Sequence, residues 1–523
     1  MKYVFADFIL DSDRSELRRN GAIVRVEPQV FDLLALLVSS GGRMVSRDAI
    51  FKAIWGDQIV SDAALSSRIK DARKALGDDG TAQKFIRTVH RRGLLFVGDV
   101  TEAQEDAPAA STATAPSQGI EHKTQQPAAI AILPLEDVST DGVSQAFART
   151  LTDELTSAMT SWRTFLVISR QSVARLGDSH RSAREIGATL NADYLLHGTL
   201  RRMGNKVRLH VTLTHAGRNT DIWNERLECH LDELHHMEHE VAAQIASIVA
   251  PELQAAEARR VLTKTPADWS VWDICMRALA MLHGAKRADL DEAEKLAQSA
   301  CSMAPDWSLP YGLVAVARFH KAMTGFSATD SSKAFSPTLE AAQRALEIDY
   351  GSWLGHSLTA VGELWTHRHH EKALLHVDRA IELNSSAAMN YHFGGCITGF
   401  SGNPTKARTY QERLFRIDPT YPYRAVIEAD LGLWHMLDRD FEPANMRLER
   451  AQNWDPFYGR ALQRRIALAG LMDDRNAAQA AAAKLKDLGL PLDPDTIVSS
   501  YPFQRAEHSE LFHDGLRRSG VNI

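Results

Sequence analysis

The sequence predicts a multidomain protein with three folded parts of different class: an α+β part, an α/β part and an all-α part. Three observations carry this prediction. A helix followed directly by a hairpin is indicated over residues 61–97. A continuous apolar segment near residue 128 opens an alternation of strands and helices. Toward the carboxyl terminus the helical pattern repeats about every 34 residues. A chain of 523 residues also has room for about three domains.

Short strands open the amino-terminal part. Alternating apolar residues predict strands over residues 3–5 and 8–10 and a hairpin over residues 16–26. Asn20 and Gly21 lie at the centre of that hairpin, and this dipeptide readily adopts the left-handed backbone that tight turns need. We therefore expect a small antiparallel sheet.

Two helices should follow this sheet. Pro28 is expected to begin the first helix, which carries apolar residues at helical spacing and ends at Gly41. Ser46 is expected to cap a second, shorter helix that ends before Gly56.

A third helix is predicted to begin at Ser61. Its apolar residues recur at helical spacing and should face a core: Leu65, Ile69, Ala72 and Leu76. This spacing turns the following side chains outward: Ser67, Arg68, Lys70, Asp71 and Lys74. A helix anchored by its apolar side, with a basic outer face, is suited to the major groove of DNA.

A hairpin with a basic turn follows this helix. Residues 85–89 and 94–97 are predicted as its strands, and His90, Arg91, Arg92 and Gly93 form the turn. The turn could reach phosphates or a minor groove. Between Arg43 and Arg92 eleven basic residues stand against six acidic ones. The competing interpretation is a surface helix with merely solvated charges, but the order of three helices and a hairpin favours DNA binding.

Three segments carry a resemblance to a known family: EPQVFDLLALLVSSGGRMVSRDAIFKAIWGD, SDAALSSRIKDARKALGDD and FIRTVHRRG. Residues 1–98 resemble the OmpR/PhoB-type winged helix-turn-helix domain. The HRRG turn and the absence of a receiver domain ahead of Met1 are more similar to its CadC/HilA/ToxR branch. Leu94 departs from the family, which commonly has an aromatic residue there.

The resemblance implies double-stranded DNA as a partner, with the helix near Ser61 in the major groove. Residues expected on that helix to contact DNA are Ser66, Ser67, Arg68, Lys70, Asp71 and Lys74. Residues expected on phosphates or in the wing are Arg47, Arg87, His90, Arg91 and Arg92. Likeness to HilA-type activators further implies recruitment of RNA polymerase.

Residues 99–127 are rich in Ala, Pro, Ser, Thr and Gln and have almost no large apolar side chains. Such a segment buries too little apolar surface to fold, so we expect a flexible linker between the amino-terminal domain and the rest.

Residues 128–258 are predicted to form an α/β domain. A buried strand over residues 129–135 precedes a helix, and residues 192–200 and 207–213 should pair across a turn at Gly204. This part resembles the amino-terminal domain of TolB and domains of proteins encoded with class III adenylate cyclases. The likeness lies in AILPLEDVS, LTDELTSAM, NADYLLHGTLRRMGNKVRLHVTL and DIWNERLE.

Residues 259–523 are predicted to be helical. Equivalent breaks fall near Pro305, Tyr350, Ser385, Pro419 and Pro456, with an insertion around residues 325–336. The period of about 34 residues is that of tetratricopeptide repeats, which stack into a superhelix with a concave groove. We expect this groove to bind RNA polymerase or another protein, or to support homo-oligomerisation.

No catalytic, cofactor or metal site is expected. The chain lacks a GxSxG motif, a GxxxxGK[ST] phosphate loop and a GxGxxG motif. His235, His236 and His239 have helical spacing, but ligands from a single helix rarely complete a tetrahedral site, so we interpret them as part of a solvated charged helix. A small-molecule pocket beside Asp141 and Gly142, after the first strand of the α/β part, stays open as an alternative.

A cytoplasmic transcription regulator is the function that these patterns favour. The four cysteines are far apart and lack CxxC spacing, and no apolar stretch is long enough for a membrane span. An alternative is a tetratricopeptide scaffold, or an accessory protein of nucleotide-cyclase signalling, that uses DNA binding only as an anchor.

Overall fold

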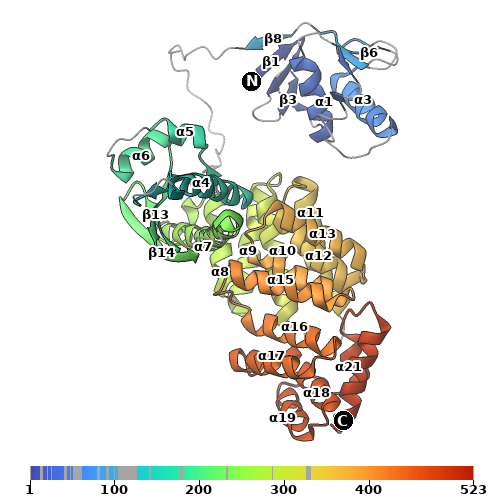
Figure 1. Cartoon of the computed structure of the whole chain (residues 1–523). Coiled ribbons are helices and arrows are strands. Elements are labelled where there is room, and N and C mark those ends of the chain that lie inside the picture. The colour runs from blue at the N-terminus through green and yellow to red at the C-terminus, as the bar shows by residue number, and fades with distance from the viewer. Residues whose placement is uncertain are drawn as a thin grey trace. The chain divides into compact units, whose positions relative to one another are not determined.

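The computed structural model shows the predicted multidomain architecture, with small sheets in the amino-terminal half and a long helical array after them (Figure 1). The structure describes residues 2–521 except for 12–15, 20–21, 25, 27, 41–43, 47–48, 51–61, 79–82, 90–92, 99, 104–126, 140–142, 177–180, 231–233, 285–286 and 325–330. The chain divides into two compact units, Met1–Gly119 and Ile120–Ile523.

The first unit contains two antiparallel sheets and two described helices. The larger sheet has the strand order β4-β3-β2-β1-β8, and the smaller one has the order β5-β7-β6. Its elements are β1 (Lys2–Phe5), β2 (Phe8–Asp11), β3 (Glu16–Arg19), β4 (Ala22–Val24), α1 (Pro28–Ser39), β5 (Val45–Ser46), α3 (Asp62–Leu76), β6 (Ile86–Val89), β7 (Gly93–Phe96) and β8 (Thr101–Ala103). The predicted strands, the first helix and the hairpin are confirmed.

Four phenylalanines join the two sheets of this unit. The ring of Phe5 lies 5.5 Å from that of Phe8 and 5.0 Å from that of Phe96, measured between centroids. Phe85 completes the cluster, 5.9 Å from Phe8. These contacts fix the β6–β7 hairpin on the amino-terminal sheet, since all four rings are buried. Leu94, where the family often has an aromatic residue, is also buried and pairs with Val45 of β5.

The sheet extends beyond the predicted end of the first domain. Thr101, Glu102 and Ala103 form β8, which pairs with β1 in the register Tyr3↔Glu102. The predicted linker began at residue 99, so this expectation needs correction: the sheet continues to Ala103. Backbone pairing with the open edge of β1 explains the strand, because it requires no apolar side chains.

The second unit begins with a mixed sheet. Strands β9 (Ala129–Ile132), β11 (Leu166–Val167) and β12 (Tyr194–Met203) run parallel, and β13 (Lys206–His215) and β14 (Thr220–His230) continue the sheet as an antiparallel meander. The turn between β12 and β13 contains Gly204 with φ +65°, as the sequence predicts. Other elements are β10 (Glu136–Asp137), α4 (Val143–Ser161), α5 (Arg170–Ala174), α6 (Ala183–Leu190) and α7 (Leu234–Val261).

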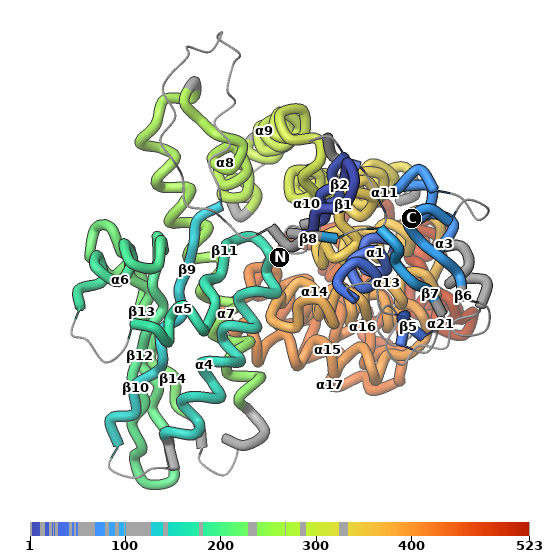
Figure 2. Tube along the Cα trace, turned by 90° about the horizontal axis from the view of Figure 1, so that it is seen from above, coloured from blue at the N-terminus to red at the C-terminus, as the bar shows by residue number. Residues whose placement is uncertain are grey.

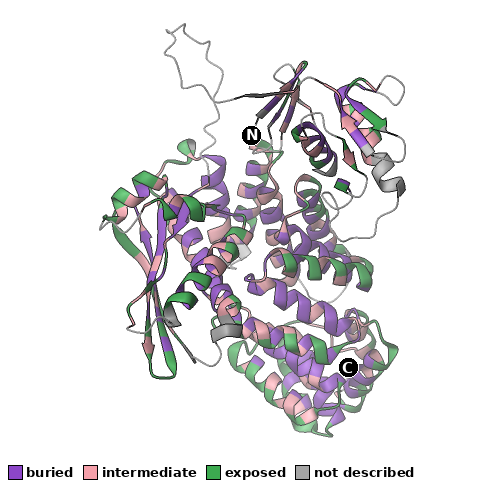
Figure 3. Ribbon diagram, turned by 45° about the horizontal axis from the view of Figure 1, so that its top comes forward, coloured by how far each residue is buried: buried purple, intermediate pink, exposed green. Residues whose placement is uncertain are grey.

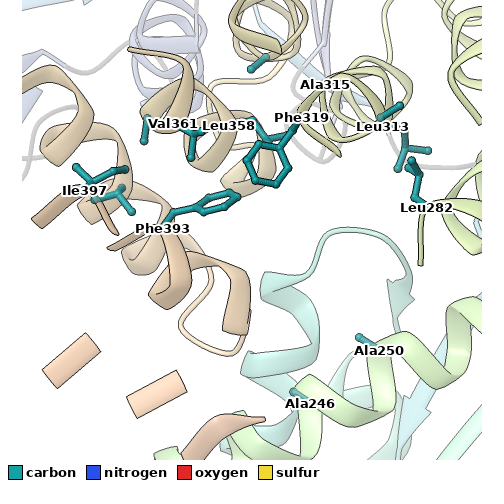
Figure 4. Close-up of a cluster of buried hydrophobic side chains, with 14 of the residues drawn as sticks. Ala246, Ala250, Leu282, Leu313, Ala315, Phe319, Leu358, Val361, Phe393 and Ile397 are labelled. Atoms are coloured by element: carbon teal, nitrogen blue, oxygen red, sulfur yellow. The ribbon is translucent and has the colours of Figure 1, made fainter. Parts of the chain in front are cut away.

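Helix α7 connects the sheet to the helical array. It packs against α4 and β14 as well as α8 and α15. Figure 4 shows Ala246 and Ala250 of α7 in the same buried cluster as Leu282, Leu313 and Phe393 of the array. The predicted boundary between residues 258 and 259 therefore falls inside α7, and the α/β part and the array share one core.

A buried polar network strengthens this junction. The Glu257 carboxylate of α7 accepts hydrogen bonds from the Tyr194 hydroxyl at 2.7 Å and the Trp272 indole N–H at 2.8 Å. Arg260 bridges Glu257 and Asp273 through Nη2, at 2.8 Å each. Hydrogen bonds and opposite charge lower the pKa values of both carboxyl groups despite their burial.

The helical array is built from antiparallel pairs (Figure 2). Its helices are α8 (Val271–Gly284), α9 (Arg287–Met303), α10 (Ser308–Thr324), α11 (Ser331–Ile348), α12 (Trp353–Gly362), α13 (His370–Leu383), α14 (Ala388–Phe400), α15 (Pro404–Ile417), α16 (Arg424–Leu437), α17 (Phe441–Trp454), α18 (Gly459–Leu471), α19 (Arg475–Asp487), α20 (Pro494–Ser499) and α21 (Ala506–Arg518). All five predicted breaks fall between helices. Figure 3 shows buried residues where helices meet and exposed residues on outer faces. Among the described residues, no helix combines the length and apolar character that a bilayer span requires.

Candidate nucleic-acid interface

Helix α3 has one buried and one exposed side. Ala72 and Leu76 are fully buried, and Ile69 packs at the edge of the same core. Lys70 and Lys74 are exposed and lie one helical turn apart. The predicted orientation of the helix is confirmed for these residues, while the side chain of Leu65 lies outside the described residues.

Gly77 ends α3 and turns the chain toward the hairpin. Its φ of +65° lies in the left-handed region, which glycine adopts without steric cost. The Asp78 N–H donates to the Arg73 carbonyl at 2.8 Å, and the Gly77 N–H donates to the Lys74 carbonyl at 3.1 Å. These bonds satisfy the last carbonyls of the helix, a common way to terminate one.

Asp78 then organises the start of β6, the first strand of the β6–β7 hairpin, which is the wing. Its buried carboxylate accepts three backbone N–H groups, from Lys84 at 2.7 Å, Phe85 at 2.8 Å and Ile86 at 3.1 Å. Hydrogen bonds to a charged acceptor are the strong ones, particularly away from water. One side chain thus fixes the beginning of β6 to the end of α3.

Arg73 makes a second connection between α3 and β6. Its Nη2 donates to the Ile86 carbonyl and to Thr88 Oγ1, both at 2.9 Å. Its charge therefore serves the internal geometry of the motif. Arg73 lies one helical turn after Ile69, beside the buried side of α3, and was not among the predicted groove-facing residues. The sequence does not identify its partner, which is a backbone carbonyl thirteen residues away.

Arg68 and Asp71 lie close together along α3. The Arg68 Nη1 and Asp71 Oδ2 atoms are 3.8 Å apart, with 27% and 42% of the side chains exposed. A partly exposed pair of this kind contributes about 0–1 kcal/mol.

The structure places some of the predicted contact residues and leaves others undescribed. Arg68, Lys70, Asp71 and Lys74 share one helix, and Arg87 is exposed on β6. The side chains of Ser66 and Ser67 in α3 are outside the described residues, as are Arg47, His90, Arg91 and Arg92.

The histidine segment at the start of α7 has a structural contact. His239 Nδ1 lies 3.1 Å from Glu154 of α4, and its Nε2 lies 3.1 Å from the Ser385 hydroxyl of the array. His239 therefore bridges three parts of the second unit. His235 and His236 are outside the residues whose side chains are described.

Comparison with known proteins places a regulator domain over the site. Residues 21–96 match the family model described as "Transcriptional regulatory protein, C terminal". This range contains α3, the β6–β7 hairpin and Asp78.

Relatives extend the likeness beyond this domain. The chain is 22% identical to the transcriptional regulator HilA of Salmonella paratyphi A over 83% of this chain and 74% of that protein. It is 28% identical to the transcriptional activator CadC of Escherichia coli over 19% of this chain and 20% of CadC. A putative adenylate cyclase 3 of Rhizobium meliloti is 24% identical over 48% of this chain and 43% of that protein.

Proposed function

We propose that this transcription regulator, whose amino-terminal domain is an OmpR/PhoB-type winged helix-turn-helix, activates promoters by placing α3 in the major groove of specific DNA sites. One observation supports this most strongly: α3 exposes Lys70 and Lys74 opposite its buried face, while Arg73 and Asp78 hold the helix and hairpin in one geometry. Preorganised cationic elements suit a duplex without a large ordering cost.

The proposed contacts divide into two groups. On α3, base edges would be read by Ser67, Arg68 and Asp71, while Ser66, Lys70 and Lys74 would also face the groove. On the wing and before the second helix, phosphates would be held by Arg47, Arg87, His90, Arg91 and Arg92. Base contacts set specificity, whereas phosphate contacts act on every sequence.

Arg68→Ala should weaken binding to the specific site by about 1–3 kcal/mol and leave binding to scrambled DNA nearly unchanged. The reason is that a base contact is lost only where the correct base is present. Fluorescence anisotropy of the full chain with both duplexes measures the difference. Arg208→Ala, an exposed arginine on β13, serves as the matched control and should change neither affinity.

Arg91→Ala should weaken binding to both duplexes equally and lower the slope of log affinity against log salt by about one. A phosphate contact releases counterions whatever the sequence. The same titrations, repeated over a range of salt concentrations, give this slope. If Arg68→Ala and Arg91→Ala lose the same binding free energy on the specific and the scrambled duplex, the proposed division into base contacts and phosphate contacts is incorrect.

The helical array is proposed as the surface that meets RNA polymerase or another protein, or a second copy of the chain. Its tetratricopeptide-like pairs form an extended surface of the kind that binds polypeptides. The proposal places this activity in the cytoplasm and assigns the chain no catalytic role.

A second candidate has one observation in its favour, the partial match to a putative adenylate cyclase. It makes the chain an accessory protein of nucleotide-cyclase signalling, with DNA binding as an anchor. Calorimetric titration of the full chain with cyclic nucleotides tests it. The full chain is needed because α7 belongs to the core of both the α/β part and the array. This candidate would be favoured if the chain binds a cyclic nucleotide and also binds DNA without preference for sequence.

A further inference from the structure

A cavity of about 560 Å³ opens among alternate helices of the array. Its walls come from α10, α14, α16 and α18, the first helices of their pairs, and from the turns before α16 and α18. This volume lies within the range of about 300–1,000 Å³ typical of small-molecule sites. A smaller adjoining cavity of about 40 Å³ shares Phe393 and Arg460 with it and reaches Trp365.

Aromatic rings form much of the cavity wall. Phe319 of α10 and Phe393 of α14 meet edge to face, 5.1 Å between centroids, as Figure 4 also shows. The ring centroids of Tyr421 and Tyr423, which precede α16, lie 5.7 Å apart. These rings line the cavity with flat apolar faces on several sides, which suits a planar apolar ligand.

Two of the polar groups beside these rings, His392 and Tyr423, are neutral near pH 7. His392 Nδ1 is 3.1 Å from the Tyr421 hydroxyl, and His320 Nε2 is 3.1 Å from the Tyr423 hydroxyl. Burial lowers the pKa of His392 to about 4 and raises that of Tyr423 to about 12. Neither group therefore brings a charge into the wall.

Arg460 of α18 brings a positive charge to the wall. Its guanidinium stacks over Tyr501, 4.2 Å from the ring centroid, and its Nη1 donates to the Ser500 hydroxyl at 2.7 Å. These contacts hold the side chain in a fixed position beside the cavity. A positioned guanidinium is a good donor to carboxylate and sulfonate oxygens.

The neighbouring Arg464 provides a comparison. Its Nη1 pairs with Asp430 at 2.6 Å, and this carboxylate helps to raise its pKa, whereas burial dominates and lowers the pKa of Arg460. The charge of Asp430 also acts on Arg460, but burial still dominates there, so a bound anion would offset part of the remaining cost of burial. Arg464 Nε is buried and has no hydrogen-bond partner among the described residues, and Arg464 lines the smaller cavity.

One acidic side chain lies at the cavity edge. Asp455 is exposed, and its Oδ1 accepts the Phe457 N–H at 2.9 Å. Phe457 is 63% exposed beside it, so this part of the wall faces solvent. The acidic group therefore lies at the rim, and solvent screening limits its effect on an anion.

We propose that this cavity binds a small, planar, mostly apolar molecule that carries one anionic group. The rings of Phe319, Phe393 and Tyr423 would enclose its apolar body, and Arg460 would receive its carboxylate or similar group. This effector site is independent of the proposed DNA interface, and its test requires no DNA.

Two fluorescent probes that differ by one sulfonate test the proposal on the full chain. We expect 8-anilinonaphthalene-1-sulfonate to bind with one-to-one stoichiometry, about tenfold or more tightly than N-phenyl-1-naphthylamine, which has the same rings without the charge. A tenfold difference in affinity is a modest effect for one charge-assisted hydrogen bond. Equal affinities, or binding that never saturates at one site, would overturn the proposal.

Substitutions of residues that line the cavity test whether the probes bind there. Arg460→Gln should remove the preference for the sulfonate, and Arg460→Lys should keep part of it. Arg475→Gln, at an exposed arginine of α19, is the matched control and should change nothing. Val426→Phe fills space in both cavities and should weaken both probes about tenfold without touching Arg460. If Val426→Phe leaves both affinities unchanged in a folded protein, the cavity is not the site.

Discussion

Asp78→Ala should destabilise the wing by about 3 kcal/mol, because three backbone N–H groups lose a buried charged acceptor at once. Alanine leaves these donors without the carboxylate, and water reaches the site poorly. Hydrogen exchange of the amides of β6 and β7 in the full chain, followed by mass spectrometry, measures the free energy of local opening. We expect the protection of Ile86 to fall by about two orders of magnitude.

The matched control is Asp71→Ala on the same helix. Asp71 is partly exposed and its ion pair with Arg68 lies within the helix, so we expect its loss to change wing protection by less than about 0.5 kcal/mol. Asp78→Asn tests the role of charge, since the amide oxygen keeps part of the acceptor capacity and should give an intermediate result. Unchanged protection in Asp78→Ala would mean that Arg73 and the aromatic cluster position the hairpin without Asp78.

Arg464→Met should destabilise the array by about 3–5 kcal/mol. The Arg464 and Asp430 side chains are only 4% and 5% exposed, and removal of the cation leaves a buried carboxylate without its partner. Burial already raises the pKa of Asp430, which shows how unfavourable the charged form is in this place. Urea unfolding followed by tryptophan fluorescence reports the loss, since Trp434 lies in the same helix as Asp430.

A second substitution separates the cost of an unpaired charge from loss of packing. In Arg464→Met with Asp430→Leu, both charges are gone and most of the stability should return. Arg379→Met breaks an exposed pair with Glu382 on α13 and should cost less than about 1 kcal/mol. A double variant as unstable as Arg464→Met would show that shape, rather than charge, dominates at this site.

Local patterns in the sequence predicted most individual elements. The hairpin at residues 85–97, the turn at Gly204 and the five breaks in the array all follow from spacing within a few residues. The basic face of α3 follows in the same way from Ile69, Ala72 and Leu76. Such features depend on short-range geometry, which a single sequence records directly.

Tertiary relationships were harder to predict. Arg73 lies one helical turn after Ile69, beside the buried side of α3, but its partner is the Ile86 carbonyl, and a sequence does not show which backbone carbonyl a side chain reaches. Strand β8 lies in a polar segment and depends on the open edge of β1. The boundary predicted between residues 258 and 259 falls inside α7, which carries apolar residues toward both the sheet side and the array.

The central claim is that α3 and its wing bind duplex DNA of defined sequence. Selection of the full chain against a library of random duplexes tests it most directly, with anisotropy titrations of the enriched duplex and a scrambled copy at physiological salt. We expect one enriched motif, bound about a thousandfold more tightly than the scrambled duplex. Retention of no duplex at low ionic strength, or retention without any enriched motif, would contradict it.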